Sequence, residues 1–266
     1  MRYTLAIGFT FICWAGLAQA ADPEVRVTDG RILGSEHQGV YAFKGIPFAA
    51  PPVGALRWQP PQPVTAWQGV RSAKHYGKDC LQEPFPGDAA PLGIGFSEDC
   101  LTLNVWRPAN ASGKLPVMVW IYGGGFVNGG SSPAVYAGDA FARQGVVFVS
   151  FNYRVGRFGF FAHPALANDP LRGNYGLMDQ LAALKWVKNN ITNFNGDPDN
   201  VTLFGESAGG FSVNSLLTSK EASGLFQKAI IQSGSGRHSI VPHQNWQQAE
   251  KAGLAFAAKH GVNGND

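Results

Sequence analysis

Apolar residues gather in short runs along the chain, separated by glycine, proline and polar residues. Residues 25–44 alternate apolar and polar positions around turn residues, which predicts a small antiparallel hairpin region. Three later runs, at 103–106, 117–122 and 146–151, are short, mainly apolar and bounded by Gly, Pro or Asn. Such runs are typical of strands buried on both faces of a parallel sheet. We therefore expect three buried parallel strands.

The hydrophobic period changes to a helical one after residue 175. Five apolar residues recur at helical spacing, namely Leu177, Leu181, Leu184, Val187 and Ile191. This spacing predicts an amphipathic helix over 176–190. A strand at 201–204, a helix at 208–217, a strand at 229–232 and a last helix at about 245–260 follow. The alternation predicts an α/β fold with a mostly parallel central sheet flanked by helices.

The N-terminal residues have the pattern of a secretory signal peptide. Arg2 precedes an apolar run over residues 5–17, and Ala18-Gln19-Ala20 has the small-x-small pattern of a signal peptidase site. A membrane anchor is the less favoured alternative, because a spanning helix needs about 20 apolar residues. We expect cleavage near Ala20, a secreted or periplasmic protein without a stable membrane span, and one domain over residues 21–266.

Composition and charge narrow the classes of partner. The chain has 266 residues, of which 45% are hydrophobic, enough to bury a large core. Its net charge is +3, and its Lys and Arg residues form no cluster or stripe, so nucleic acid binding is not expected. The sequence leaves the oligomeric state open.

Cysteine usage fits an exported protein. Cys13 falls within the expected leader, which leaves Cys80 and Cys100 in the mature chain. One disulfide is the simplest interpretation, and two free buried thiols are the alternative. A metal site is not expected, because no His or acidic residue lies at zinc-ligand spacing from these cysteines.

Two glycine-rich segments carry candidate chemistry. Gly205-Glu206-Ser207-Ala208-Gly209 follows a predicted strand and precedes a predicted helix, which is the setting of a nucleophile elbow. A helix N-cap serine is the alternative, but it leaves both flanking glycines unexplained. Gly123-Gly124-Gly125-Phe126 follows another predicted strand, and such glycines can turn backbone N–H groups toward an oxyanion.

The two segments belong to a series of seven motifs that occur in a characteristic order along the chain. They are K-G-I-P-F-A at 44–49, P-P-V-G at 51–54, S-E-D-C-L-T-L-N-V at 97–105, W-I-Y-G-G-G-F at 120–126, N-Y-R-V-G at 152–156, G-L-M-D-Q at 176–180 and F-G-E-S-A-G-G at 204–210. With them the chain resembles the N-terminal half of the type-B carboxylesterase and cholinesterase family of α/β-hydrolases. The resemblance implies hydrolysis of a small-molecule carboxylic ester through an acyl-enzyme, with no metal or organic cofactor.

The resemblance also implies roles for individual residues. Ser207 is the expected nucleophile, and Gly124, Gly125 and Ala208 are the expected oxyanion donors. Glu206 is expected to line the gorge rather than to serve as the triad acid. The expected structural pairs are the disulfide Cys80–Cys100 and the ion pairs Arg57–Glu98 and Arg154–Asp179.

The triad partners of the serine are expected beyond this sequence. In the α/β-hydrolase fold an acid and then a histidine follow the serine, and the resemblance places both past residue 266. We therefore expect the isolated fragment to lack them and the C-terminal strands, and to be nearly inactive. His238, His243 and His260 follow Ser207 but are interpreted as surface or loop residues.

Two other functions on the same fold stay open. One is a non-catalytic adhesion or binding protein, against which the retained serine and glycines argue. The other is a serine amidase or peptidase, because a nucleophile elbow does not distinguish esters from amides. A choline ester is disfavoured, since no tryptophan lies between Cys80 and Cys100 to stack on a cation.

Overall fold

The computed structural model of the chain describes residues 22–88, 90–166, 173–234 and 245–263. The expected leader, residues 1–20, lies outside the described residues, as do His238 and His243. Within the described parts no helix is both long enough and apolar enough to cross a bilayer.

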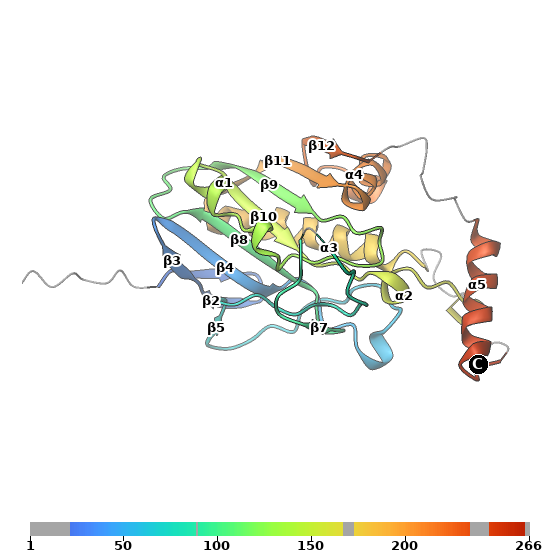
Figure 1. The fold of residues 1–266 in the computed structure, drawn as a ribbon. Coiled ribbons are helices and arrows are strands. Elements are labelled where there is room, and N and C mark those ends of the chain that lie inside the picture. Colours follow the sequence, from blue (N-terminus) through green and yellow to red (C-terminus); the bar gives the residue numbers. More distant parts are fainter. Residues whose placement is uncertain (1–21, 89, 167–172, 235–244, 264–266) are drawn as a thin grey trace, which may run out of the picture.

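A seven-stranded sheet runs through the centre of the described residues (Figure 1). Its spatial order is β12 (Lys228–Gln232), β11 (Gly196–Glu206), β9 (Leu115–Ile121), β10 (Val147–Phe151), β8 (Thr102–Pro108), β4 (Val40–Pro47) and β3 (Ser35–His37). The four strands from β12 to β10 are parallel to one another. The other three join by antiparallel pairs. The sheet is thus mixed, with its parallel half carrying the two glycine-rich segments.

The expected direction of the strand at 103–106 was wrong. This segment forms β8, which pairs antiparallel with both β10 and β4. Leu103 and Val105 on one face and Trp106 on the other are fully buried, so the strand is covered on both faces. An apolar run records burial and carries no information about strand direction. The strands at 117–122 and 146–151 form β9 and β10, and these two are parallel as expected.

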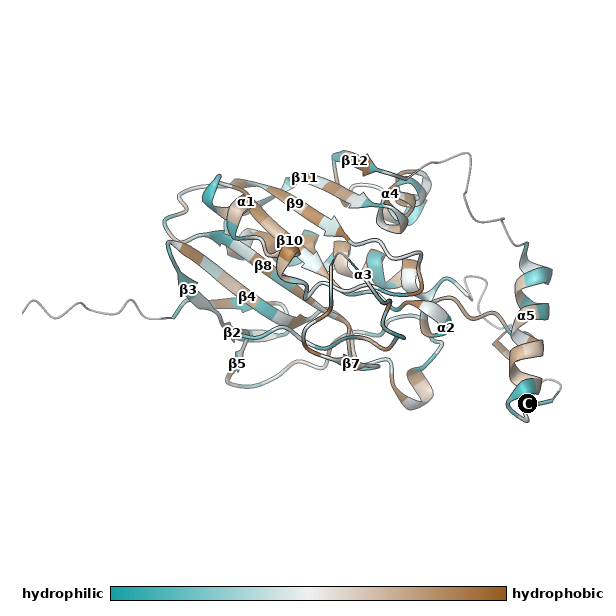
Figure 2. Cartoon of the chain, viewed as in Figure 1, coloured by the Kyte–Doolittle hydropathy of each residue, from teal (hydrophilic) through white to brown (hydrophobic). Residues whose placement is uncertain are grey.

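Alternating side chains of the sheet meet helices on opposite faces. Phe148 of β10 lies on one face and stacks on Phe141 of α1 (Asp139–Arg143), with ring centroids 4.8 Å apart. Phe43 of β4 lies on the other face and meets Phe194, which follows α3 (Tyr175–Asn190), at 5.1 Å. The period of two along a strand separates these faces. Figure 1 shows α1 in front of the sheet and α3 behind it, and Figure 2 shows the strands between them as apolar.

Of the remaining helices, the second and third named below were predicted, and the short helix at 156–159 was not. They are α2 (Gly156–Gly159), α4 (Ala208–Thr218) and α5 (Trp246–Lys259). A capping box formed by Asn245 and Gln248 starts α5, and Gly261, at φ +82°, lies just past its end. α5 stands apart from the sheet in Figure 1 and packs on the segment around Phe161 and Ala162.

The expected N-terminal hairpin region is present as two hairpins. β1 (Glu24–Val27) pairs antiparallel with β2 (Gly30–Leu33), and β5 (Val70–Ser72) extends this small sheet by a parallel pairing with β2. The second hairpin, β3 with β4, joins the central sheet. β6 (Asp79–Cys80) and β7 (Phe96–Ser97) pair with each other beside it.

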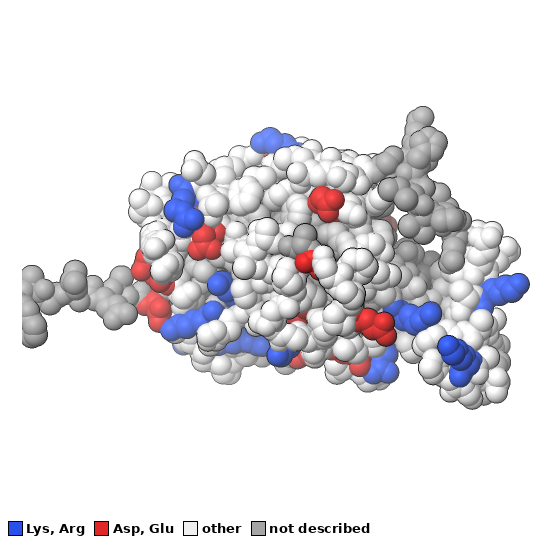
Figure 3. Space-filling model, viewed as in Figure 1, with Lys and Arg blue, Asp and Glu red and all other residues white. Residues whose placement is uncertain are grey.

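Short 3₁₀ helices complete the structure: η1 (Gly54–Leu56), η2 (Ala134–Tyr136), η3 (Pro164–Leu166), η4 (Ile191–Phe194) and η5 (Lys220–Ala222). After η4, Asn195 takes a left-handed conformation at φ +60°. Asparagine tolerates this region better than most residues, and here the turn leads directly into β11. On the molecular face shown in Figure 3, charges of both signs are interspersed over the described residues.

Candidate active site

Ser207 occupies a strained turn between β11 and α4. Its φ of +53° and ψ of −121° lie outside the regions that residues with a Cβ atom ordinarily adopt. The turn is held on one side by β12, because the N–H of Ser207 donates to the carbonyl of Gln232 at 2.9 Å. It is held on the other by α4, since the carbonyl of Ser207 accepts from Phe211 N–H at 2.9 Å. The serine side chain is half-buried.

Steric crowding requires glycine at positions 205 and 209, on either side of Ser207. A Cβ atom on Gly209 would lie 2.1 Å from the carbonyl oxygen of Ile121, and one on Gly205 would lie 2.6 Å from the backbone of Gly209. Both distances are far inside van der Waals contact, and the atoms met belong to backbone. The motif thus lets the start of α4 approach the end of β9 closely.

The segment after β9 reaches the serine directly. We call residues 123–131 the glycine loop. A Cβ atom on Gly123 would lie 3.1 Å from Cβ of Ser207, so these two positions are in contact. Gly124 and Gly125 follow at φ +103° and +61°, which places them in the region that favours glycine.

Backbone N–H groups gather near this contact. Among the residues that the structure describes, the N–H groups of Gly124 and Gly125 have no hydrogen-bond acceptor. Ala208 is the first residue of α4, and N–H groups of a first helical turn lack acceptors within the helix. Free N–H groups beside a serine suit the binding of a negatively charged oxygen.

Glu206 ends β11 and directly precedes Ser207. Its side chain is half-buried, and its Oε2 would lie 3.0 Å from a Cβ atom on Gly123. Burial, with the negative charges of Asp88 and Glu206, raises the pKa of Tyr136. Glu206 therefore adds negative charge to the surroundings of the glycine loop.

Within the described ranges no histidine forms a hydrogen bond with Ser207. His163 is buried against Phe161, with ring centroids 6.0 Å apart and nearly parallel rings. His260 directly follows α5 and contacts Phe256. His37 ends the edge strand β3. These positions supply no base to the serine.

Two arginine–carboxylate pairs flank the site. Arg57 donates to Glu98 through two bonds of 2.6 Å, and both side chains are partly exposed. Arg154 and Asp179 are buried, and the guanidinium donates to both carboxylate oxygens at 2.8 and 2.9 Å. The N–H of Arg154 adds a third bond to Asp179. This second pair joins the end of β10 to α3.

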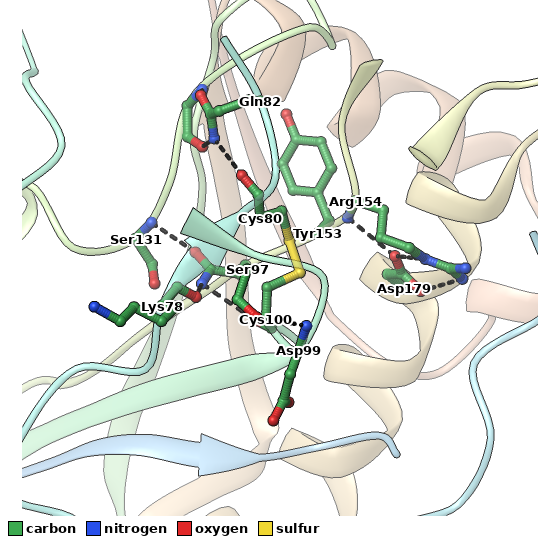
Figure 4. The surroundings of a disulfide bond; sticks show 12 residues. Lys78, Cys80, Gln82, Ser97, Asp99, Cys100, Ser131, Tyr153, Arg154 and Asp179 are labelled. Carbon is green, nitrogen blue, oxygen red and sulfur yellow. Dashed lines mark hydrogen bonds and ion pairs between the residues drawn. A yellow bond between two sulfur atoms is a disulfide. The ribbon is translucent and has the colours of Figure 1, made fainter. Parts of the chain in front are cut away.

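Cys80 and Cys100 form a disulfide, as the resemblance implies. Figure 4 shows it between the Arg154–Asp179 pair and a set of backbone-binding side chains. One of these, Gln82, binds Gly129 of the glycine loop. Sequence reasoning missed Gln82, because the contact joins positions 47 residues apart. The two consecutive glycines at 129 and 130 are the one sequence signal that another segment packs closely against the loop at this point.

No metal site accompanies these residues in the part of the chain that the structure describes. It contains no group of three or more His, Cys, Asp or Glu side chains placed to bind an ion. The described residues at this place supply a serine hydroxyl, backbone N–H groups and a nearby carboxylate.

Comparisons with known proteins agree with one another. A model of the carboxylesterase family matches residues 21–266. The chain is 46% identical over 264 residues to a fumonisin B1 esterase of Sphingopyxis macrogoltabida, covering 97% of this chain and 48% of that protein. It is also 46% identical over 239 residues to a para-nitrobenzyl esterase of Bacillus subtilis, covering 88% and 47%.

Solved structures show the same fold. A para-nitrobenzyl esterase superposes with a TM-score of 0.82 at 43% identity, covering 91% of this chain and 49% of that one. A carboxylesterase of Geobacillus stearothermophilus gives 0.81 at 44% identity, with 91% and 49% covered. The architecture is therefore that of an α/β-hydrolase, and the chain spans about half the length of the relatives it matches.

Proposed function

The chain belongs to the carboxylesterase family, and on this premise we propose that the protein hydrolyses carboxylic esters through an acyl-enzyme on Ser207. The observation that carries the proposal is the contact between the strained serine turn and the glycine loop, at Gly123. It brings a nucleophile and free backbone donors to one point. Relatives named as esterases of fumonisin B1 and of para-nitrobenzyl compounds support the reaction class.

The proposed reaction has two steps of the same kind. Oγ of Ser207 attacks the carbonyl carbon as its proton passes to a base, and the carbonyl electron pair moves onto oxygen. The N–H groups of Gly124, Gly125 and Ala208 stabilise that oxyanion. Collapse re-forms the C=O bond and breaks the bond to the alkoxy oxygen, which takes the proton from the base and leaves as a neutral alcohol, so that an acyl-serine remains. Water then attacks the acyl-serine in the same way and releases the acid.

The proposed base and its acid partner lie outside the described residues. The fold orders them after the serine, and the relatives extend over about twice this length. We therefore propose that a histidine and an acid complete the site in the protein expressed from its full reading frame. Each oxyanion donor is typically worth about 10² to 10³ in rate, so donors alone give little turnover.

A fluorophosphonate probe tests the nucleophile in that protein. We expect one covalent label on the wild type and none on Ser207→Ala, with ester turnover reduced about 10⁶-fold. Ser215→Ala is the matched control, because Ser215 lies exposed on the same helix α4. Matched p-nitrophenyl esters and anilides separate an esterase from an amidase. An unlabelled wild type, or a label that persists in Ser207→Ala, would refute the proposal.

A further inference from the structure

The glycine loop leaves β9 at a rigid point. Tyr122 and Tyr153, which follow β9 and β10, stack with ring centroids 4.4 Å apart and bind each other's backbone through both hydroxyl groups. Farther along, the carbonyl of Phe126 accepts from Gly156 N–H at 2.6 Å. The stretch that contains Gly124 is thus tied at its start and its middle.

Near the far end of the loop, both backbone groups of Gly129 bind the same side-chain amide. Oε1 of Gln82 accepts from Gly129 N–H at 2.7 Å, and Nε2 of Gln82 donates to the Gly129 carbonyl at 2.7 Å. Gln82 Nε2 also donates to the carbonyl of Cys80 at 2.9 Å (Figure 4). Both backbone groups of Gly129 are therefore satisfied by one residue from a distant segment.

Gly129 needs such a partner. Its φ is +113°, and a Cβ atom there would lie 2.6 Å from the Tyr122 ring and 2.7 Å from the Gly123 carbonyl. Glycine is the residue with the widest conformational freedom, so this turn is not rigid on its own account. The two bonds to Gln82 are the hydrogen bonds that orient the N–H and carbonyl groups of Gly129 directly.

The support behind Gln82 is itself anchored. The disulfide joins Cys80 to Cys100, and Nδ2 of Asn152 donates to the carbonyls of Lys78 and Cys100. Oδ1 of the same Asn152 accepts from Ser131 N–H at 2.8 Å. Figure 4 shows these bonds on one side of the disulfide. The disulfide segment and the end of the glycine loop are thus one bonded unit.

On the basis of the proposed function, we propose that Gln82 is a positioning residue for ester hydrolysis. Its amide fixes Gly129 and, through the short loop, holds the N–H groups of Gly124 and Gly125 where the oxyanion forms. Donors aimed at the transition state act on turnover more than on substrate binding. A misplacement of about 1 Å in such a site can cost about 10² in rate.

The test uses Gln82→Met and Gln82→Ala in the protein expressed from its full reading frame. Methionine keeps the length of the side chain and removes the amide, so it separates hydrogen bonding from packing. Gln62→Ala is the matched control: Gln62 also donates to a carbonyl two residues earlier, that of Pro60 at 2.9 Å, but is exposed and has no bond to the glycine loop. Active sites are counted by fluorophosphonate titration.

We expect kcat per active site to fall about 10- to 100-fold in both Gln82 variants, with KM within about threefold of wild type. A trifluoromethyl ketone forms a serine adduct that carries an oxyanion, so its inhibition constant should rise in parallel. Gln62→Ala should match the wild type. The proposal is overturned if kcat per active site and ketone affinity stay within twofold of wild type in Gln82→Met, or if the loss is only in the number of active sites. A wild type without turnover or label would instead refute the proposed function.

Discussion

At the scale of single residues, Asp79 is a buried acid whose titration affects stability. It is fully buried beside the disulfide, Ser132 donates to its Oδ2, and its Oδ1 has no partner among the described residues. Burial raises the pKa of Asp79 from 3.8 to about 6, against the opposing effect of its hydrogen bonds with Ser132, Ser131 and Asn152. The folded protein therefore holds a proton that the unfolded chain has lost.

The sign of the stability change follows from this difference. Between pH of about 4 and about 6 the native state binds more protons than the unfolded state, so the free energy of unfolding falls as pH rises. A rise in pKa of about two units corresponds to about 3 kcal/mol, all of it lost above pH 6. The free energy of unfolding, measured in urea at several pH values, should therefore depend less on pH in Asp79→Asn than in the wild type across this range. Asp99 is exposed, so Asp99→Asn should keep the wild-type slope of unfolding free energy against pH. The same slope in Asp79→Asn as in the wild type would contradict this role of Asp79.

Backbone conformation was predictable where its requirement is local in sequence. The Gly-x-Ser-x-Gly segment and the triple glycine each carry their own conformational requirement, and the positive φ of Ser207, Gly124 and Gly125 agrees with it. The tie between Gln82 and Gly129 has no such local signal. A glutamine in a polar loop is compatible with many surroundings, so only the tertiary structure reveals its partner.

At the scale of elements, the approach of α4 to β9 positions Ser207. β11 and β9 share a parallel ladder that pairs Gly205 with Ile121, so the serine turn and the glycine loop leave the sheet at the same edge. Ligand sites of open α/β sheets lie outside the carboxyl ends of their strands. The direction of β8 was not predictable in this way, because a fully buried strand has the same apolar pattern in either direction.

Gly209→Ala tests this close packing. The added methyl group would lie 2.1 Å from the Ile121 carbonyl oxygen and 2.9 Å from that of Tyr122, so backbone must move. We expect a loss of about 3 kcal/mol in the free energy of unfolding, measured in urea, and slower fluorophosphonate labelling. Gly93→Ala is the control, because a Cβ atom there meets nothing within 4 Å. Wild-type stability of Gly209→Ala would rule out the close approach.

At the scale of the whole molecule, the described residues form a core that supports the candidate site. The central sheet carries the serine turn and the glycine loop on neighbouring parallel strands, and the disulfide segment braces the loop from the side. The strand β12 lies at the edge of the sheet with Ile230 and Ile231 exposed. The family resemblance made the α/β-hydrolase architecture predictable, since its motifs mark the turns around which that fold is built.

The central claim is that Ser207 carries the acyl group during turnover. Its most direct test is mass spectrometry of the protein expressed from its full reading frame, quenched in acid while it turns over a p-nitrophenyl ester and then digested. The account predicts the mass of the acyl group on the peptide that contains Ser207, and an unmodified peptide in Ser207→Ala. Turnover with the acyl group on another residue, or with no acylated peptide, would contradict it.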